Sequence, residues 1–458
     1  MSRFDAIIVG AGQAGSPLAA RLSAAGMSVA LIERHLVGGT CVNTGCMPTK
    51  TLVASAYAAR IARRAAEYGV VLDGPVGIDM KRVKARAQKI TLDAREGLEK
   101  WIAGMSGVTL LRGQARFTGP RTLMVGDQEI EGERVFLNVG GRASRPPMPG
   151  IDSVPVMTNT DIVALDELPR HLVVVGGSYI GLEFAQMYRR FGAEVTVVEK
   201  GPRLIAREDP EVSAAVQAML EKEGIAFRLD AECIHFAPSD EGVLVGVDRE
   251  SGEPEIPGSH VLLAIGRTPN TGDLGLDAAG VETDSRGYIK VDDKLETNVP
   301  GIFALGDCNG RGAFTHTAYN DFEIVADNML DGADRKLSDR ISTYALFVDP
   351  PLARVGMSPL EAKAAGHDVL VGHRPMTRVG RAKEKAETEG FMQVVVDAGS
   401  RKILGATIFG ASGDEAIHCV LDLMYMGGTA ENLAHAMHIH PTVAELLPTI
   451  AGELEPFA

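Results

Sequence analysis

The chain has 458 residues, a length that exceeds one ordinary hydrophobic core and predicts about three domains. Hydrophobic residues make up 45% and charged residues 23%, as in soluble globular proteins, and the formal net charge of −14 argues against nucleic acid or an anionic membrane as partner. No apolar run is long enough for a transmembrane helix and the N-terminus lacks the features of a signal peptide, so we expect a cytoplasmic protein.

The first predicted unit is a strand, a glycine-rich turn and a helix. Residues 4–9 form a short apolar run typical of a buried parallel strand, and residues 16–25 are expected to be helical. The glycines of the intervening turn have the spacing of a dinucleotide-binding fingerprint: Gly10, Gly12 and Gly15. They permit the tight turn, the approach of a pyrophosphate and close helix–strand packing, respectively. Glu33 ends the next strand, where a carboxylate accepts hydrogen bonds from a ribose.

Two cysteines, Cys41 and Cys46, follow this unit in a glycine-rich segment. On a regular helix, residues five apart have Cα atoms about 8–9 Å from each other, beyond the limit of about 7 Å for a disulfide. Cys41 must therefore lie in a turn or a distorted first helical turn if the bond forms, and Gly45 makes such a path available. Taken alone, the spacing is also compatible with a zinc site or a structural role. Cys233 and Cys419 are expected to be ordinary packed cysteines.

The strand, turn, helix and acidic residue recur later in the chain. Residues 172–175 are an apolar run, and residues 195–198 form a second one that ends in an acidic residue. The fingerprint positions of this copy are Gly176, Ser178, Gly181 and Glu199, and its acid follows its first glycine at the same separation as in the first copy. Two dinucleotides are therefore expected. Glu199 favours NADH over NADPH because a carboxylate repels a 2′-phosphate, although Lys200 and Arg203 nearby could partly reverse this preference.

Three further segments, residues 264–270, 304–307 and 440–445, complete a series of motifs that covers essentially the whole chain. In kind and in order, these motifs resemble those of the class I pyridine nucleotide-disulfide oxidoreductases. This family includes glutathione reductase, lipoamide dehydrogenase and mercuric reductase. The resemblance implies an α/β fold with two Rossmann-like dinucleotide-binding domains plus a C-terminal α+β dimerisation domain. It further implies an FAD-dependent NAD(P)H:disulfide oxidoreductase that works as a homodimer.

The resemblance also implies a division of the chain into domains. Residues 1–150 and 271–340 would form the FAD-binding domain in two parts. Residues 151–270 would bind NADH or NADPH, and residues 341–458 would form the dimerisation domain.

The resemblance assigns roles around a redox disulfide. Cys46 would lie against the flavin, and Cys41 would be the interchange thiol that meets the substrate. Lys50 would lie near the reactive side of the flavin, paired with Glu183. Tyr179 matches the aromatic gate that covers the nicotinamide pocket until the nucleotide enters.

Further cofactor and proton-transfer residues follow from the same resemblance. Asp307 would bind the ribityl chain of FAD, and the remaining cofactor contacts are assigned to Thr40 and Gly266. Cys308 borders the flavin or simply packs. His440 and Glu445 would be the acid–base pair, which in relatives reaches across the dimer interface into the cysteine site of the other subunit.

The electron acceptor is not fixed by these residues. A small oxidised disulfide is expected, with a metal-ion reductase for Hg(II) or Cu(II) and a lipoamide dehydrogenase as alternatives. Residues 452–458 lack the cysteine pair of typical mercuric reductases, which counts against Hg(II). A flavin-bearing scaffold or redox sensor that docks within a larger complex without turnover of its own is the non-enzymatic alternative. His435, His438 and His440 lack the further ligands of a metal centre, so none is expected.

Overall fold

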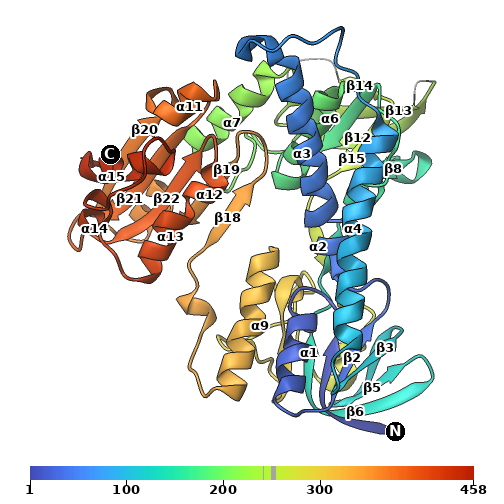
Figure 1. Ribbon diagram of the computed structural model, residues 1–458. Helices are drawn as coiled ribbons and strands as arrows, with labels where there is room; N and C mark the ends of the chain where they lie inside the picture. Colours follow the sequence, from blue (N-terminus) through green and yellow to red (C-terminus); the bar gives the residue numbers. More distant parts are fainter. Residues whose placement is uncertain (241, 249–253, 458) are drawn as a thin grey trace.

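The computed structural model describes residues 1–240, 242–248 and 254–457 (Figure 1). Three sheets of five to seven strands carry helices on their faces within this part of the chain. The domain limits expected from the sequence remain a prediction, but each large sheet draws its strands from a separate stretch of sequence, apart from one late strand that returns to the first sheet.

The N-terminal sheet has the order β3-β2-β1-β6-β5-β4, with β17 added beside β6. β1 lies parallel to both β2 and β6, so the apolar run after residue 4 is buried at the centre of the sheet. Its strands are β1 (Ser2–Val9), β2 (Val29–Glu33), β3 (Val108–Arg112), β4 (Ala115–Gly119), β5 (Thr122–Val125), β6 (Gln128–Leu137) and β17 (Ile302–Ala304). Helices α1 (Gly15–Ala24) and α9 (Thr315–Leu330) contact each other beside this sheet.

A helical pair connects the first two sheets. The elements of this region are α2 (Gly39–Asn43), α3 (Cys46–Arg63), η1 (Ala65–Tyr68) and α4 (Met80–Ala103). The Asp79 side chain accepts a hydrogen bond from the Arg82 amide and so caps α4, which packs along α3. Figure 1 shows α3 and α4 running from the N-terminal sheet to the second sheet, where α3 also contacts α6.

The second parallel sheet has the order β11-β10-β9-β15-β8. Its strands are β8 (Val156–Met157), β9 (His171–Val175), β10 (Glu194–Val198), β11 (Ala226–Arg228) and β15 (His260–Leu263). A small antiparallel sheet precedes β15 in the chain: β12 (Glu232–Ser239), β13 (Gly242–Asp248) and β14 (Glu255–Gly258). The helices of this region are α5 (Asn159–Ile162), α6 (Tyr179–Phe191) and α7 (Pro210–Lys222). The ten buried residues of α6 make this helix part of the largest apolar cluster.

The C-terminal sheet is antiparallel, with the order β18-β19-β22-β21-β20-β23. Its strands are β18 (Thr343–Leu346), β19 (Leu352–Gly356), β20 (Val369–Pro375), β21 (Phe391–Asp397), β22 (Ile403–Phe409) and β23 (Glu455–Pro456). The accompanying helices are α10 (Pro359–Ala364), α11 (Gly380–Glu384), α12 (Gly413–Ala416), α13 (His418–Tyr425), α14 (Ala430–Ala434) and α15 (Leu447–Gly452). Its exposed large apolar side chains include Tyr425, Met426, Met437 and Ile439.

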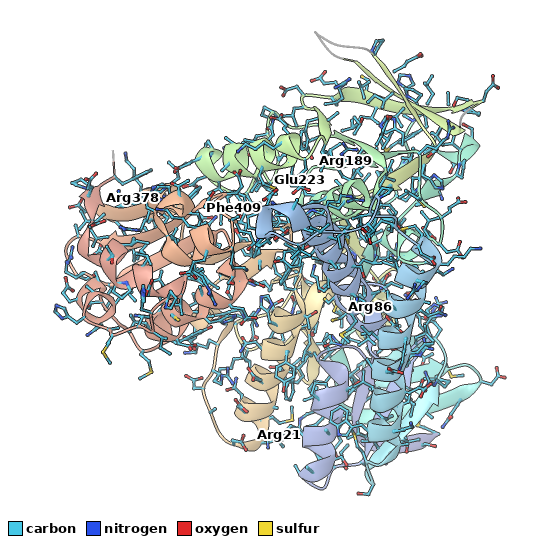
Figure 2. All side chains as sticks on the ribbon, turned by 45° about the horizontal axis from the view of Figure 1, so that its top comes forward. Arg21, Arg86, Arg189, Glu223, Arg378 and Phe409 are labelled. Carbon is cyan, nitrogen blue, oxygen red and sulfur yellow. The ribbon has the colours of Figure 1, made fainter. Side chains whose placement is uncertain are left out.

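Buried charges join the second sheet to the C-terminal sheet. Arg190 of α6, only 5% exposed, bonds at 2.6 Å to Glu223 and at 2.6 Å to Asp349, and Asp349 also bonds to Arg60 of α3. Figure 2 shows Glu223 in this region beside Arg189, with Phe409 on the sheet next to it. Phe409 belongs to the same apolar cluster as the buried face of α6, so the two regions share one core.

Candidate active site

The two glycine turns have the same local geometry. The first glycine of each turn has a positive φ, 106° at Gly10 and 116° at Gly176. A Cβ atom would lie 2.2 Å from the carbonyl oxygen of Asn138 at Gly10, and 2.4 Å from that of Ala264 at Gly176. At the last glycine of each turn, Gly15 and Gly181, a Cβ atom would lie 2.0 Å from the oxygen of the first glycine. Both helices therefore start directly against their strands.

The acidic residues at the ends of β2 and β10 are held by backbone amides in the same way. Glu33 accepts hydrogen bonds from the amides of Ala11, at 3.0 Å, and His35, at 2.8 Å. Glu199 accepts from the amides of Gly177, at 2.6 Å, and Gly201, at 2.8 Å. Each carboxylate is thus fixed beside its glycine turn, where a bound dinucleotide would place a ribose.

Asn138 supports the first turn and was not predicted from the sequence. Its Oδ1 accepts a hydrogen bond from the Gly15 amide at 3.0 Å, and its Nδ2 donates to the Leu305 carbonyl oxygen at 3.0 Å. The side chain therefore joins the start of α1 to the end of β17. An asparagine directly after the apolar end of β6 was the available signal, because a polar residue at that edge of a parallel sheet meets the neighbouring turns.

Asp307 and Cys308 lie together in η3 (Gly306–Asn309), which follows β17. Asp307 lies 3.3 Å from Arg267, and burial raises the pKa of its carboxyl group. Cys308 is fully buried, its thiol donates to the carbonyl oxygens of Leu137 and Leu305 at 3.3 Å, and burial raises its pKa to about 12. Cys308 therefore packs as a neutral thiol.

Thr40 and Gly266 are the two remaining predicted cofactor residues. Thr40 is exposed on α2. Gly266 has a φ of 117° and its carbonyl oxygen accepts from the Ser144 amide at 2.9 Å.

Cys41 and Cys46 lie in two separate helices, as their spacing in the sequence requires if they are to form a disulfide. Cys41 is in the five-residue helix α2, and Cys46 is the first residue of α3, with a break in the helix at Thr44 and Gly45. A Cβ atom at Gly45 would lie 3.2 Å from the Cys41 Cα atom, so the close return of the chain depends on glycine there. Both sulfurs are thiols in this structure. The Cys46 Sγ atom also lies 3.2 Å from the hydroxyl oxygen of Thr315, at the start of α9.

The pKa values of the two thiols are shifted in opposite directions. The hydrogen bond from the Cys41 side chain, with further contributions from the Thr315 hydroxyl and the charge of Lys50, lowers the pKa of Cys46 to about 6. The same interaction with Cys46, together with burial, raises the pKa of Cys41. At neutral pH the first proton lost from the pair therefore leaves a thiolate on Cys46 that Cys41 stabilises.

This asymmetry predicts the pH dependence of alkylation in the reduced protein. Because only the thiolate reacts, the rate at which iodoacetamide modifies Cys46 is expected to rise with pH around a midpoint near 6 rather than near its usual value of 9.0. Peptide mass spectrometry after timed alkylation measures this rate. Cys419 serves as the internal reference because it is exposed, as is Cys233, so the expectation that these two cysteines are packed was wrong. Lys50→Met should shift the midpoint upward, and a midpoint near 9 in the unmodified chain would contradict the assignment.

Lys50 lies one helical turn after Cys46 and is held on two sides. Its ammonium group bonds to Glu183 of α6 at 2.6 Å and lies 4.4 Å from the centroid of the Phe347 ring. The other carboxylate oxygen of Glu183, a side chain that is 8% exposed, accepts from the Phe347 amide at 2.9 Å. The lysine–glutamate pair expected from the resemblance is therefore formed.

Tyr179 and Ser178 lie at the N-terminus of α6. Ser178 is exposed at the position where the first unit has Gly12, so its side chain does not block the turn. The Tyr179 hydroxyl donates to Glu208 at 2.9 Å, a contact that the sequence did not suggest.

His440 and Glu445 form a hydrogen bond of 2.8 Å through Nδ1 of the ring. The histidine side chain is 81% exposed whereas that of Glu445 is 15% exposed. In the chain the pair lies between α14 and α15, which Figure 1 shows at the left edge of the molecule, well separated from α2 near its middle. Within one chain, therefore, the structure does not bring His440 to the cysteines.

Comparison with known proteins decides the family. The family model described as pyridine nucleotide-disulphide oxidoreductase matches residues 4–321, and that of its dimerisation domain matches residues 342–451. The chain belongs to the pyridine nucleotide-disulphide oxidoreductases. The predicted fold class and the predicted FAD-dependent NAD(P)H:disulfide oxidoreductase activity are thereby confirmed, and the homodimer is supported by the dimerisation domain.

Individual oxidoreductases match over nearly their full lengths. The chain is 34% identical to the probable pyridine nucleotide-disulfide oxidoreductase RclA of Escherichia coli (strain K12), covering 98% of both chains. It is 33% identical to a dihydrolipoyl dehydrogenase of Chlorobaculum parvum, covering 97% of this chain and 95% of that one. It is 32% identical to a mercuric reductase of Streptomyces lividans, covering 98% and 95%. The Cu(II) complex of the HOCl-induced flavoprotein disulfide reductase RclA superposes with a TM-score of 0.90 at 33% identity, covering 99% of both chains.

FAD, which the family implies, fits the groups around the first turn of this oxidoreductase. The Ser16 hydroxyl oxygen is buried and has no hydrogen-bond partner among the described residues. It lies with Gly12 at a cavity of about 190 Å³. A hydroxyl group without a partner, beside the glycine turn at a helix N-terminus, is a group that binds a pyrophosphate. Glu33, Asp307 and Lys50 would hold the ribose, the ribityl chain and the ring of this cofactor.

Two features are absent from the described residues. No helix among them is both long and apolar enough to cross a membrane. Within the same ranges, no three His, Cys, Asp or Glu side chains gather closely enough to hold a metal ion.

Proposed function

We propose that this oxidoreductase passes electrons from NADH to a small disulfide through the pair Cys41 and Cys46. The observation that carries the proposal is the exposed His440 ring, whose Nδ1 is held by Glu445 at 2.8 Å. Thiol–disulfide exchange releases a thiolate that must be protonated, and a histidine with one nitrogen fixed serves as such an acid–base group. Reduction of a bare metal ion requires no such proton transfer.

The two sulfurs of the cysteine pair have different roles in the reaction. FAD, when bound, supplies hydride acceptance from the nicotinamide and electron transfer to the disulfide. Lys50 stabilises the Cys46 thiolate, and His440 from the other subunit takes the Cys41 proton. The Cys41 sulfur then attacks the substrate disulfide and forms a mixed disulfide, while the imidazolium returns the proton to the departing thiolate. The Cys46 thiolate attacks the Cys41 sulfur and restores the intramolecular disulfide, and the second thiolate leaves and takes its proton from solvent.

We further propose NADH as the preferred nucleotide. Glu199 is fixed by the same pair of amide contacts as Glu33, which would serve FAD, a cofactor without a 2′-phosphate. Arg203 donates to the Ala206 carbonyl oxygen at 2.9 Å rather than neutralising Glu199. The carboxylate therefore keeps its charge where it would repel the 2′-phosphate of NADPH.

The Glu199→Gln variant is expected to lower the ratio of kcat/KM for NADH to that for NADPH by about tenfold, because it removes the repelling charge and keeps the side-chain shape. Steady-state kinetics with both nucleotides measures the ratio. Glu194→Gln, at the other end of β10, is the matched control and should leave the ratio unchanged. A ratio that stays constant in Glu199→Gln would refute the role of Glu199 in nucleotide choice.

Reduction of a metal ion is the second candidate, because the RclA structure is a Cu(II) complex and a mercuric reductase is among the relatives. Steady-state NADH oxidation by the holoenzyme with lipoamide, glutathione disulfide, Cu(II), Hg(II) or a quinone separates the candidates. We expect the highest kcat/KM with a disulfide and expect His440→Gln to lose this turnover selectively. Metal ions that react faster than every disulfide, with no effect of His440→Gln, would favour the second candidate.

We place the protein in the cytoplasm. A redox pair that must be reduced by a nicotinamide nucleotide in every cycle suits a reducing compartment. Fractionation of cells that express the full chain tests this location.

A further inference from the structure

The hydroxyl group of Tyr179 is attached to a buried acidic side chain. It donates to the Oε1 atom of Glu208 at 2.9 Å, and Glu208 is only 2% exposed. Burial raises the pKa of Tyr179, so the hydroxyl remains protonated and continues to donate. The Tyr179 ring meets Phe314 edge-on at 6.4 Å and Tyr344 edge-on at 5.6 Å. The tyrosine is thus held both by its ring and by its hydroxyl group.

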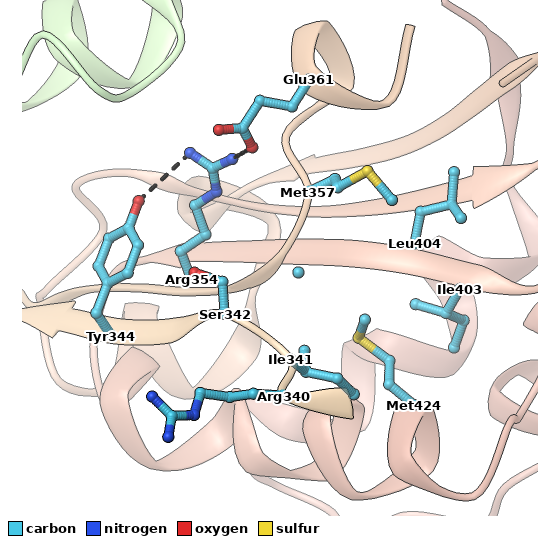
Figure 3. Close-up of a pocket in the computed structure, with 11 residues that line it drawn as sticks. Arg340, Ile341, Ser342, Tyr344, Arg354, Met357, Glu361, Ile403, Leu404 and Met424 are labelled. Atoms are coloured by element: carbon cyan, nitrogen blue, oxygen red, sulfur yellow. Dashed lines mark hydrogen bonds and ion pairs between the residues drawn. The ribbon is translucent and has the colours of Figure 1, made fainter. Parts of the chain in front are cut away.

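Glu208 is itself held by two strands of the C-terminal sheet. Tyr344 of β18 donates to the same Oε1 atom at 2.6 Å. Arg354 of β19, which is 3% exposed, bonds to the Oε2 atom at 3.2 Å and also pairs with Glu361 of α10. Figure 3 shows Arg354 between Tyr344 and Glu361 at the edge of a cavity of about 520 Å³. Every oxygen of the Glu208 carboxylate therefore has a donor from the sheet of the dimerisation domain.

We propose that Glu208 is a positioning residue that holds Tyr179 closed over the nicotinamide pocket, and that Tyr344 and Arg354 hold Glu208 from the dimerisation domain. This inference rests on the proposed function, in which the unit from Gly176 to Glu199 binds NADH, and on the role of Tyr179 implied by the family resemblance, in which its ring covers the nicotinamide pocket. The Glu208 carboxylate makes the closed position more stable than ring packing alone would, and it connects nucleotide entry to the sheet of the dimerisation domain.

This arrangement is expected to weaken the binding of the nicotinamide nucleotide. For the nicotinamide to enter, the Tyr179 ring must move aside and its hydroxyl group must leave a charged acceptor that is shielded from water. The apparent affinity is lowered by the fraction of molecules that are closed. A nucleotide fragment without nicotinamide does not displace the ring, so its affinity carries no such cost.

Equilibrium binding of two ligands to the holoenzyme tests the inference. Tetrahydro-NAD has the shape of NADH and donates no hydride, whereas ADP-ribose lacks the nicotinamide. Tyr179→Phe keeps the ring contacts and removes the hydroxyl group, so calorimetry should show a Kd for tetrahydro-NAD about three- to tenfold lower than in the unchanged enzyme, with the Kd for ADP-ribose unchanged. Tyr188→Phe is the matched control, because this buried tyrosine of α6 donates to the Ile162 carbonyl oxygen instead.

A double-mutant cycle assigns the effect to Glu208. The charges are removed together as Glu208→Gln with Arg354→Met, because removing one partner would leave the other buried and unpaired. The paired change should lower the Kd for tetrahydro-NAD by a similar factor in the presence of Tyr179 and have no further effect in Tyr179→Phe. Independent effects that multiply would overturn the proposal. If the paired change prevents folding, the Tyr179→Phe arm decides, since it leaves the ion pair intact.

Failure of the inference differs from failure of the proposed function. If Tyr179→Ala tightens tetrahydro-NAD binding but Tyr179→Phe does not, Tyr179 covers the pocket without help from Glu208, and the inference is wrong. If ADP-ribose and tetrahydro-NAD do not compete, or neither Tyr179 variant changes the affinity for tetrahydro-NAD, the assignment of the nicotinamide pocket is wrong, and the inference falls with it.

Discussion

Replacement of Cys41 by serine is expected to reduce kcat for a disulfide substrate by at least about a thousandfold, with binding of FAD and of nucleotide retained. A serine hydroxyl group does not attack a disulfide at neutral pH, and no other described thiol is paired with Cys46.

The measurement compares kcat with flavin absorbance and with the Kd of ADP-ribose in the same preparation. Cys419→Ser removes an exposed thiol on α13 and should retain full turnover, so it controls for general thiol chemistry. Full disulfide turnover by Cys41→Ser would show that the interchange thiol lies elsewhere, whereas loss of bound flavin would show that Cys41 has a structural role.

The His440→Gln variant is expected to lower kcat for a disulfide by about 10²- to 10⁴-fold and to remove the limb of the pH–rate profile that the imidazole controls. Glutamine keeps a polar group near Glu445 and cannot carry a proton at neutral pH. His438→Gln alters a neighbouring histidine, which bonds to the Ala436 carbonyl oxygen, and should leave turnover unchanged. An unaltered pH–rate profile in His440→Gln would refute the acid–base role.

Mixed dimers test from which subunit His440 acts. A dimer of one Cys41→Ser chain and one His440→Gln chain contains one intact site if the histidine acts across the interface, and none if it acts within its own chain. A randomly assorted equal mixture of the two inactive variants should therefore recover about a quarter of the unchanged activity. No recovery, with mixed dimers demonstrated by native mass spectrometry, would place the histidine in its own chain's site.

Local sequence patterns predicted the parts of the site whose geometry is set within a few residues. The turns at Gly10 and Gly176 follow from steric limits on the backbone, and the break between Cys41 and Cys46 follows from the dimensions of a helix. The roles of Lys50 and Glu183 came only from the resemblance, because their contact joins α3 to α6 and no local pattern encodes it.

The unpredicted contacts come from elements distant in the sequence. Thr315 reaches Cys46 from the start of α9, and Asn138 reaches the first glycine turn from the end of β6. Glu208 lies in a charged segment before α7, and nothing in the local sequence indicates that it is buried. Its burial is possible because Arg354 pairs with its charge and Tyr344 donates a hydrogen bond to it. Such pairings depend on how sheets and helices pack, so a single sequence does not reveal them.

Glu183 links the start of α6 to the cysteine pair. Its two carboxylate oxygens bond to Lys50 and to the Phe347 amide, and the helix that carries it, α6, begins at Tyr179. Lys50 in turn contributes to the acidity of Cys46. A small displacement of α6 during nucleotide entry would move the positive charge relative to the sulfur. The helix can thus transmit the arrival of the electron donor to the sulfur that will carry the electrons.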